Sequence, residues 1–262
     1  MESDFHLAKW YFDCITGDGE ACIGYASTVR WKKLTLRYTS LLCAGPQRPV
    51  MTSTTHTVSD FPVLRNDRIE WVCPELDAGG TWCRRAPAVE RTLLENEHGF
   101  IRWNCVMPGA DASVRIGSKH GNGLGYVEFL EMTIPPWKMP IEQLRWGRFV
   151  APEDAVVWIE WSGPHPLNFI YHNGSEITMP QYSDSRISSR DGSFAVELDR
   201  AAVIRSGSVL NTVLKKIPGI DLVFPKNILH TDEHKWISGC TFHRPDHSII
   251  IGQAIHELVR FI

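Results

Sequence analysis

Apolar and polar residues alternate over short stretches along most of this chain, and clusters of turn-forming residues separate the stretches. Asp18-Gly19 predicts a hairpin, because an Asp-Gly pair readily adopts the positive φ that a tight turn needs. Residues 34–42 predict a further strand, and residues 63–71, 92–106 and 228–242 each predict a strand, a polar turn and a second strand. Turn signals at intervals of about 8–12 residues favour an all-β barrel or sandwich.

The second half of the chain resembles the first. At an offset of 135, residues 93–117 fall on residues 228–252, and the identical pairs include Leu94/Leu229, Cys105/Cys240, Asp111/Asp246, Ser113/Ser248 and Gly117/Gly252. At an offset of 136, Trp10 falls on Trp146. A period this long exceeds that of a solenoid repeat, so it predicts two copies of one β-domain.

The boundary between the copies is predicted at a proline-rich segment. Prolines 135, 136 and 140 lie close together, and proline removes a ladder donor and favours extended backbone. We therefore expect an N-terminal domain over residues 1–133, a linker over residues 134–143 and a C-terminal domain over residues 144–262.

Two stretches also have a helical pattern. Residues 86–97 contain helix formers, but their counterpart in the second copy is strand-like, so we expect a strand there. Residues 206–217 carry apolar side chains at a spacing of three and four, which predicts a short helix that Pro218-Gly219 would end. Residues 121–125, a glycine-rich run, predict an additional hairpin turn in the first copy.

Composition narrows the class of protein. The 262 residues are 43% hydrophobic and 22% charged with a net charge of −3, which argues against a nucleic-acid binder. No apolar run approaches the length of a membrane span, and the first residues lack the features of a signal peptide. We therefore expect a cytoplasmic protein whose seven cysteines, none of them in a Cys-x-x-Cys pair, are reduced thiols.

Short motifs along the chain carry a family resemblance. Residues 10–13 (Trp-Tyr-Phe-Asp), 125–128 (Gly-Tyr-Val-Glu), 144–149 (Leu-Arg-Trp-Gly-Arg-Phe) and 252–257 (Gly-Gln-Ala-Ile-His-Glu) resemble the lipocalin-like carotenoid 1,2-hydratase (hydroxyneurosporene synthase) family. That group includes kievitone-hydratase-like proteins and fungal Diels–Alderase-like pericyclases. The resemblance implies two tandem lipocalin-like (calycin) antiparallel β-barrels related by internal duplication, with a ligand pocket in or between them.

The resemblance also implies an enzyme of secondary metabolism that acts on an apolar terpenoid, polyene or polyketide, as a hydro-lyase, isomerase or cyclase. Acid-catalysed hydration of an alkene needs a carboxylic acid whose charged form is disfavoured by burial, and aromatic faces that stabilise a carbocation. The candidate catalytic residues are Asp13, Glu128, His256 and Glu257. In a regular strand His256 and Glu257 point to opposite faces, and Glu128 aligns with Glu257. The candidate substrate-binding residues are Trp10, Tyr11, Trp146, Arg148, Trp158 and Tyr171.

Each of these residues has a structural interpretation too. The acids could form salt bridges, the tryptophans could fill a core, and Tyr171 could belong to a turn. His230/His234 and His243/His247, with Asp232 and Asp246 nearby, have a spacing that can suit a metal, but they fall in a predicted turn and loop, so we expect no metal and no cofactor.

Three functions remain open. The first is the hydratase-, isomerase- or cyclase-type enzyme, with a pocket at the interface of the two barrels. The second is a non-catalytic carrier of an apolar ligand, and the third is a pericyclase that works by positioning its substrate. All three predict an apolar small molecule as the partner, with neither nucleic acid nor a membrane span, and all are compatible with a homodimer.

Overall fold

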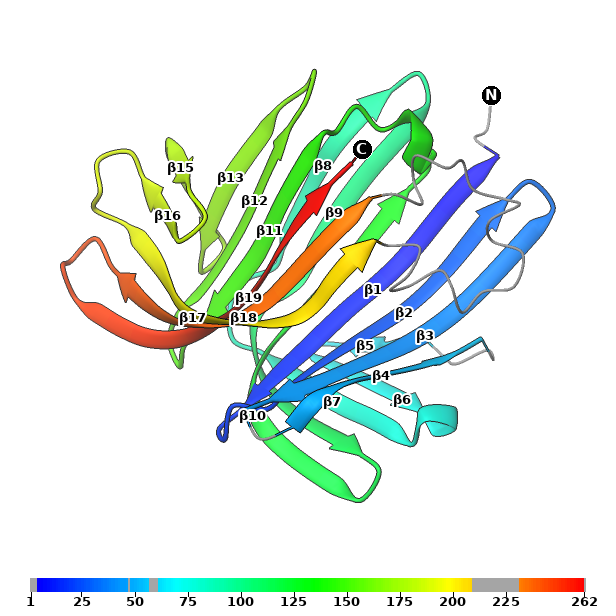
Figure 1. Ribbon diagram of the computed structural model, residues 1–262, viewed down its shortest axis with the longest axis horizontal. Helices are drawn as coiled ribbons and strands as arrows, with labels where there is room; N and C mark the ends of the chain where they lie inside the picture. Colours follow the sequence, from blue (N-terminus) through cyan, green and yellow to red (C-terminus); the bar gives the residue numbers. More distant parts are fainter. Residues whose placement is uncertain (1–3, 47, 57–60, 209–230, 262) are drawn as a thin grey trace. The chain divides into compact units, whose positions relative to one another are not determined.

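The computed structural model describes residues 4–46, 48–56, 61–208 and 231–261. The chain divides into two compact units, Met1–Pro135 and Pro136–Ile262, and each unit is built on its own antiparallel sheet (Figure 1). The described residues contain no α-helix and two short 3₁₀ turns, so the all-β class predicted from the alternation is confirmed. Among these residues, no helix is long and apolar enough to cross a membrane.

Unit 1 contains a 10-stranded sheet in the order β4-β3-β2-β1-β10-β9-β7-β6-β5, with β8 also paired to β9. Its elements are β1 (Phe5–Thr16), β2 (Ala21–Trp31), β3 (Leu34–Gly45), β4 (Arg48–Thr55), β5 (Val63–Arg65), β6 (Arg68–Cys73), η1 (Pro74–Leu76), β7 (Ala78–Arg84), β8 (Val89–Asn96), β9 (Gly99–Ile116) and β10 (Lys119–Met132).

Unit 2 contains a 9-stranded sheet in the order β14-β13-β12-β11-β19-β18-β17-β16-β15. Its elements are η2 (Pro136–Lys138), β11 (Gln143–Val150), β12 (Ala155–Ser162), β13 (Leu167–His172), β14 (Ser175–Ile177), β15 (Pro180–Tyr182), β16 (Arg186–Ser189), β17 (Ala195–Ser208), β18 (Asp232–His243) and β19 (Ile249–Arg260). The proline-rich segment forms the short η2 turn, where the sequence predicted extended backbone.

The two units repeat one topology. Each begins with a strand that pairs with its own last strand, β1 with β10 and β11 with β19, and the other strands follow in the same order. Within these ladders Glu128 faces Tyr11 and Glu257 faces Trp146. The duplication is therefore confirmed, and it makes Glu128 and Glu257 equivalent as the sequence predicted.

Two other pairs that the sequence alignment matched between the copies, Asp111/Asp246 and Cys105/Cys240, do not occupy equivalent positions in the two units. Asp111 lies within β9, whereas Asp246 lies in the turn after β18, because β9 has 18 residues and β18 has 12. Cys240 belongs to the apolar core of unit 2, while Cys105 lies beside Tyr126, away from the core of unit 1. One constant offset cannot follow a hairpin whose strands differ in length between the copies.

Each sheet packs one face into a core of its own unit. Phe12 and Cys14 of β1 belong to the core of unit 1, together with Trp71 and Trp82, and Trp10 packs against it. Phe149 of β11 belongs to the core of unit 2. Successive strand residues point to opposite faces, so Tyr11 and Asp13 lie on the face of β1 away from this core. Trp146, on the face of β11 opposite Phe149, matches Tyr11 rather than Trp10.

The glycine-rich run at residues 121–125 is part of strand β10, so the predicted turn is wrong. A side chain at Gly123 would place its Cβ 2.0 Å from the carbonyl oxygen of Ile15, and one at Gly125 would place it 2.3 Å from that of Asp13. Glycine is needed at these positions because the backbone of β1, the strand paired with β10, lies too close to leave room for a Cβ. These glycines set the approach of the two strands that carry the site described below.

Several local predictions are confirmed. The hairpin at Asp18-Gly19 joins β1 to β2, with Gly19 at a φ of 83°, and most of residues 86–97 form strand β8 (Val89–Asn96) rather than a helix. The helix predicted for residues 206–217 has its first three residues in β17, and the rest lies outside the described residues. The turn predicted at residues 230–235 is strand from Asp232 onward, and His230 lies outside the described residues. All seven cysteines are free thiols, and only Cys83 is exposed.

Candidate functional site

Strands β1 and β10 carry four polar residues on the face of the unit 1 sheet that is opposite to its core. Tyr11 lies across the ladder from Glu128, and Asp13 lies across from Tyr126. Strand alternation places all four side chains on one face, because Phe12 and Val127, which lie between them, enter the core. The two acids are buried: Asp13 has none of its surface exposed and Glu128 has 7%.

Each acid of this cluster accepts a hydrogen bond from a tyrosine two residues away on the same strand. The Tyr11 hydroxyl donates to Oδ2 of Asp13 at 3.0 Å, and the Tyr126 hydroxyl donates to Oε2 of Glu128 at 2.6 Å. The indole Nε1 of Trp103, on β9, donates to the same Glu128 oxygen at 2.6 Å. Buried carboxyl groups need such donors, since an unsatisfied buried polar group is costly. We call Tyr11, Asp13, Tyr126 and Glu128 the acid–tyrosine cluster.

Tyr126 of the cluster stays protonated near neutral pH. Burial raises the pKa of Tyr126 well above its ordinary value, and the nearby Cys105 and Glu128 raise it further. Burial likewise raises the pKa of the Cys105 thiol well above its ordinary value. Tyr126 is therefore a hydrogen-bond donor toward Glu128 near neutral pH.

Aromatic rings surround the acids. Tyr11 packs edge to face against Tyr25 and Tyr126, with ring centroids 5.3 and 5.9 Å apart. The indole of Trp82 on β7 donates to the backbone carbonyl oxygen of Asp13 at 2.7 Å, which holds this part of β1 in place. The cluster thus combines two carboxyl groups removed from solvent, phenol donors and aromatic faces, a set that suits proton transfer to or from an apolar molecule.

The equivalent position in unit 2 has different partners. Glu257 forms an ion pair with the ammonium group of Lys235, a β18 residue whose side chain is 3% exposed. Lys235 also lies 3.9 Å from Glu233 and 5.6 Å from the ring centroid of Trp146. Two separately predicted site residues, Trp146 and Glu257, therefore lie around one cation, Lys235, which was not among the candidates.

His256 lies on the opposite face from Glu257, as the strand alternation predicted. Its Nε2 lies 2.9 Å from the hydroxyl of Ser238, and its ring stacks on Trp236 with centroids 5.2 Å apart. Burial lowers the pKa of His256 to about 4, with Glu257 and Lys235 acting in opposite directions. His256 is therefore neutral near pH 7 and does not join the acid–tyrosine cluster, which belongs to unit 1.

The other predicted binding residues are dispersed. Trp158 belongs to the core of unit 2, where its ring packs against Gly147. Tyr171 lies in the β13–β14 hairpin, and its hydroxyl donates to Glu176 at 3.2 Å. Trp10 packs on the core side of β1, away from Tyr11. Arg148 is fully buried and donates to the carbonyl oxygen of Gln253 at 3.3 Å.

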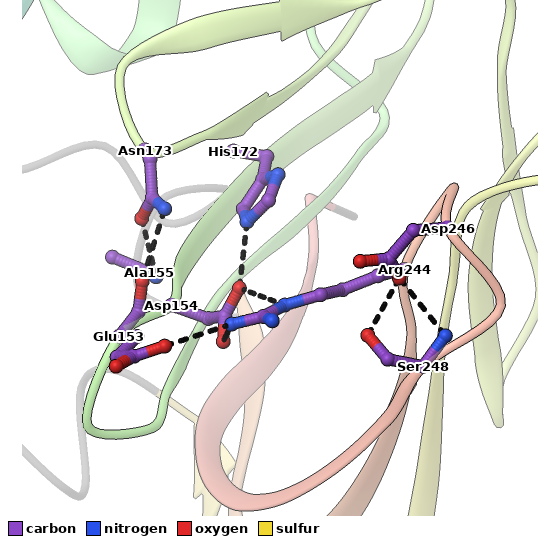
Figure 2. Close-up of polar contacts among 8 residues, drawn as sticks. All are labelled: Glu153, Asp154, Ala155, His172, Asn173, Arg244, Asp246 and Ser248. Atoms are coloured by element: carbon purple, nitrogen blue, oxygen red, sulfur yellow. Dashed lines mark hydrogen bonds and ion pairs between the residues drawn. The ribbon is translucent and has the colours of Figure 1, made fainter.

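A second polar cluster ties two turns of unit 2 together (Figure 2). Asp154, in the β11–β12 turn, accepts both Nε and Nη2 of Arg244 at 2.9 and 2.6 Å, and Nε2 of His172 lies 2.9 Å from its Oδ1. Arg244 starts the β18–β19 turn, in which Asp246 accepts hydrogen bonds from the backbone and side chain of Ser248. Because Arg244 of one turn forms a two-point ion pair with Asp154 of the other, we interpret the cluster as a structural clamp.

The histidine pairs considered for a metal do not converge. His234 contacts Asp232 and Ser206, while His243 lies 3.6 Å from Glu197. Within the described residues, no group of three or more metal-ligating side chains comes together.

The sequence analysis identified Asp13, Tyr11 and Glu128 but missed two donors. Tyr126 could have been found, because in a strand it shares a face with Glu128 two positions later. Trp103 could not, because it reaches Glu128 from another strand and the β9–β10 ladder has two register shifts nearby.

Comparisons with known proteins identify the fold. A scan of the sequence against protein-family models gives no match, and neither does a comparison with curated protein sequences. Among solved structures, CghA matches with a TM-score of 0.58 and 11% identity, over 98% of this chain and 89% of CghA. CghA solved with Sch210972 matches with a TM-score of 0.55 and 12% identity, over 98% of this chain and 89% of that chain. Kievitone hydratase from Nectria haematococca matches with a TM-score of 0.52 and 10% identity, over 97% and 88%. At these identities the likeness concerns the fold, and the chain has the lipocalin-like, two-sheet fold of CghA and kievitone hydratase.

Proposed function

We propose that this protein is an enzyme that acts on an apolar small molecule, of the terpenoid, polyene or polyketide class, by acid-catalysed hydration or dehydration, isomerisation or cyclisation. The observation that carries the proposal is the acid–tyrosine cluster, in which two buried carboxyl groups each accept a phenol hydrogen bond. The fold shared with a kievitone hydratase supports the same class of reaction.

In this proposal Asp13 and Glu128 divide the proton transfer between them. Glu128 accepts hydrogen bonds from Tyr126 and Trp103, which stabilise its carboxylate, so it serves as the base. Asp13, whose charged form is disfavoured by complete burial, delivers a proton to the substrate double bond. The faces of Tyr11 and Tyr126 stabilise the positive charge that develops on carbon.

The test is loss of turnover without loss of fold. Asp13→Asn and Glu128→Gln keep the size of each side chain but cannot transfer a proton, and we expect each to lower the rate by about 10²–10⁴-fold. The matched control is Glu176→Gln, an exposed acid that accepts the Tyr171 hydroxyl in unit 2, which should retain the rate.

The assay can proceed without a known substrate. Purified protein is incubated with terpenoid, polyene and polyketide extracts, and the products are followed by mass spectrometry for gain or loss of water or for a changed retention time at constant mass. A bound compound recovered unaltered by the wild type would favour a carrier instead. Full turnover in both amide variants would favour a pericyclase that positions its substrate, and either result would overturn the proposed acid catalysis.

A further inference from the structure

Unit 1 contains a pocket on the other side of its sheet from the acid–tyrosine cluster. It has a volume of about 440 Å³, within the range of small-molecule sites. Strands β8, β9 and β10 form its walls, and Glu90, Arg91, Thr92, Arg102, Trp103, Asn104, Phe129 and Glu131 line it. Phe129 and Glu131 alternate with Glu128 along β10, so the pocket opens on the face that Glu128 does not occupy.

The pocket presents the guanidinium group of Arg102, which no carboxylate engages within the part of the chain that the structure describes. Arg102 lies directly across the ladder from Glu131, but Glu131 contacts Nε2 of His6 at 2.9 Å instead. The other acid of the pocket, Glu90, accepts a hydrogen bond from Asn104 at 2.9 Å. Among the described residues Arg102 makes no ion pair, and it stacks over the ring of Phe100 with 3.9 Å to the ring centroid.

A second polar group beside Arg102 also lacks a partner. The side-chain oxygen Oδ1 of Asn104 is shielded from solvent and accepts no hydrogen bond from the described residues. Arg102 and Asn104 lie two positions apart on one face of β9, which separates them by about 7 Å along the strand. A buried acceptor without a donor costs free energy that a ligand donor would recover.

An apolar wall completes the pocket. Phe129 packs against Trp10 in a tilted arrangement, with ring centroids 5.0 Å apart and an angle of 46° between the ring planes, which restrains its ring. Trp103, between Arg102 and Asn104 on β9, points its indole to the Glu128 face, so Phe129 is the aromatic side chain that faces the ligand. The pocket therefore offers a cation, an acceptor and an aromatic surface within a short distance of each other.

We propose that this pocket binds a small amphiphilic carboxylate. The carboxylate pairs with the guanidinium of Arg102, whose fork geometry suits a two-oxygen acceptor. A hydroxyl close to the carboxylate donates to Oδ1 of Asn104, and the apolar body lies against Phe129. The inference does not depend on the proposed reaction, since it concerns other residues on the opposite face of the sheet.

The experiment measures binding by isothermal titration calorimetry with decanoate, 3-hydroxydecanoate, decanol and decylamine as probes. In the wild type we expect decanoate to bind more tightly than decanol or decylamine, and 3-hydroxydecanoate to bind more tightly still. Arg102→Gln should weaken decanoate binding at least tenfold and leave decanol binding unchanged. The matched control is Arg115→Gln, also on β9, whose guanidinium pairs with Asp77 outside the pocket.

The outcomes separate clearly. Unchanged decanoate binding in Arg102→Gln, equal binding of decylamine and decanoate, or equal weakening by Arg115→Gln would each overturn the proposal. Arg102 is exposed, so its replacement should not disturb the fold, and Arg102→Lys should recover part of the affinity. Turnover plays no part in this readout, so failure of the pocket and failure of the proposed reaction are distinguishable.

Discussion

Glu128 in unit 1 and Glu257 in unit 2 occupy the same place in the same topology, but their surroundings differ in kind. Glu128 faces Tyr11 and is held by the neutral donors Tyr126 and Trp103. Glu257 faces Trp146 and is held by the ammonium group of Lys235. Both units therefore have a carboxylate at this ladder position, but its partner is a pair of neutral hydrogen-bond donors in unit 1 and an ammonium group in unit 2.

This difference separates a structural acid from a candidate chemical one. An ammonium group fixes the charge of its partner, because protonating the carboxylate would leave a buried cation alone. Phenol and indole donors stabilise the acid without opposing a change in its charge to the same degree. We therefore propose unit 1 as the copy in which a proton is exchanged, whereas in unit 2 the equivalent acid forms a buried ion pair with Lys235.

The largest effect on stability is expected when the cation in unit 2 is removed. Lys235→Met would leave Glu257 and Glu233 without their buried partner, and we expect a loss of about 3–5 kcal/mol in the free energy of unfolding. Chemical denaturation measures the change. The double variant Lys235→Met/Glu257→Gln should recover a large part of it, and a double variant as unstable as the single one would show that the ion pair is not the cause.

The next test uses pH, because the position equivalent to Val127 of unit 1 is His256 in unit 2. Burial lowers the pKa of folded His256 to about 4, against 6.5 for the ordinary histidine. Between these values the unfolded chain binds more protons than the folded one, so stability falls as pH decreases from 6.5 to 4. The contribution lost is at most about 3 kcal/mol.

The effect of His256 is measured by difference. Denaturation curves of the wild type and of His256→Gln are compared at pH 7 and at pH 4.5, and the wild type should lose more stability between these values than the variant does. Parallel losses in the two proteins would mean that His256 does not titrate in this window.

The smallest effect on stability is expected when a single hydroxyl is removed from unit 1. Tyr126→Phe deletes the donor to Glu128 and should cost about 1–3 kcal/mol, because a buried carboxyl group loses one of its partners. Tyr171→Phe, which removes a hydroxyl that donates to Glu176 at an exposed site, should stay within about 0.5 kcal/mol of the wild type. Equal effects of the two changes in thermal or chemical denaturation would contradict the distinction.

The strands of this fold could be predicted from the sequence, since alternation and turn residues are local signals. The correspondence between the copies could be predicted only in part. It holds where strands of the two units have similar registers, as at Tyr11 and Trp146, and it fails where β9 exceeds β18 by six residues, 18 against 12. A glycine-rich strand such as residues 121–125 also resembles a turn in the sequence. The structure shows that these glycines make room for the backbone of the paired strand β1.

The site was predictable to the extent that its members share a strand. Asp13 and Tyr11 lie on β1, so alternation brings them together, and the same argument would have added Tyr126 to Glu128. Trp103 and Lys235 depend on pairing with a distant strand, which no local pattern reveals. Trp158 and Tyr171 were candidates because tryptophan and tyrosine line pockets as readily as they fill cores, and only packing distinguishes these roles.

The pairing of the first and last strand within each unit has a consequence for how such a protein can change. Leu7 lies across from Met132, and Gln143 lies across from Arg260, so the chain enters and leaves each sheet at the same corner. A gene segment encoding one such module can be copied in tandem with only a short connector, and neither copy needs to open a strand pair to accommodate the other. The same property makes each unit a suitable scaffold for circular permutation, with new ends placed in an exposed hairpin such as the one at Asp18-Gly19.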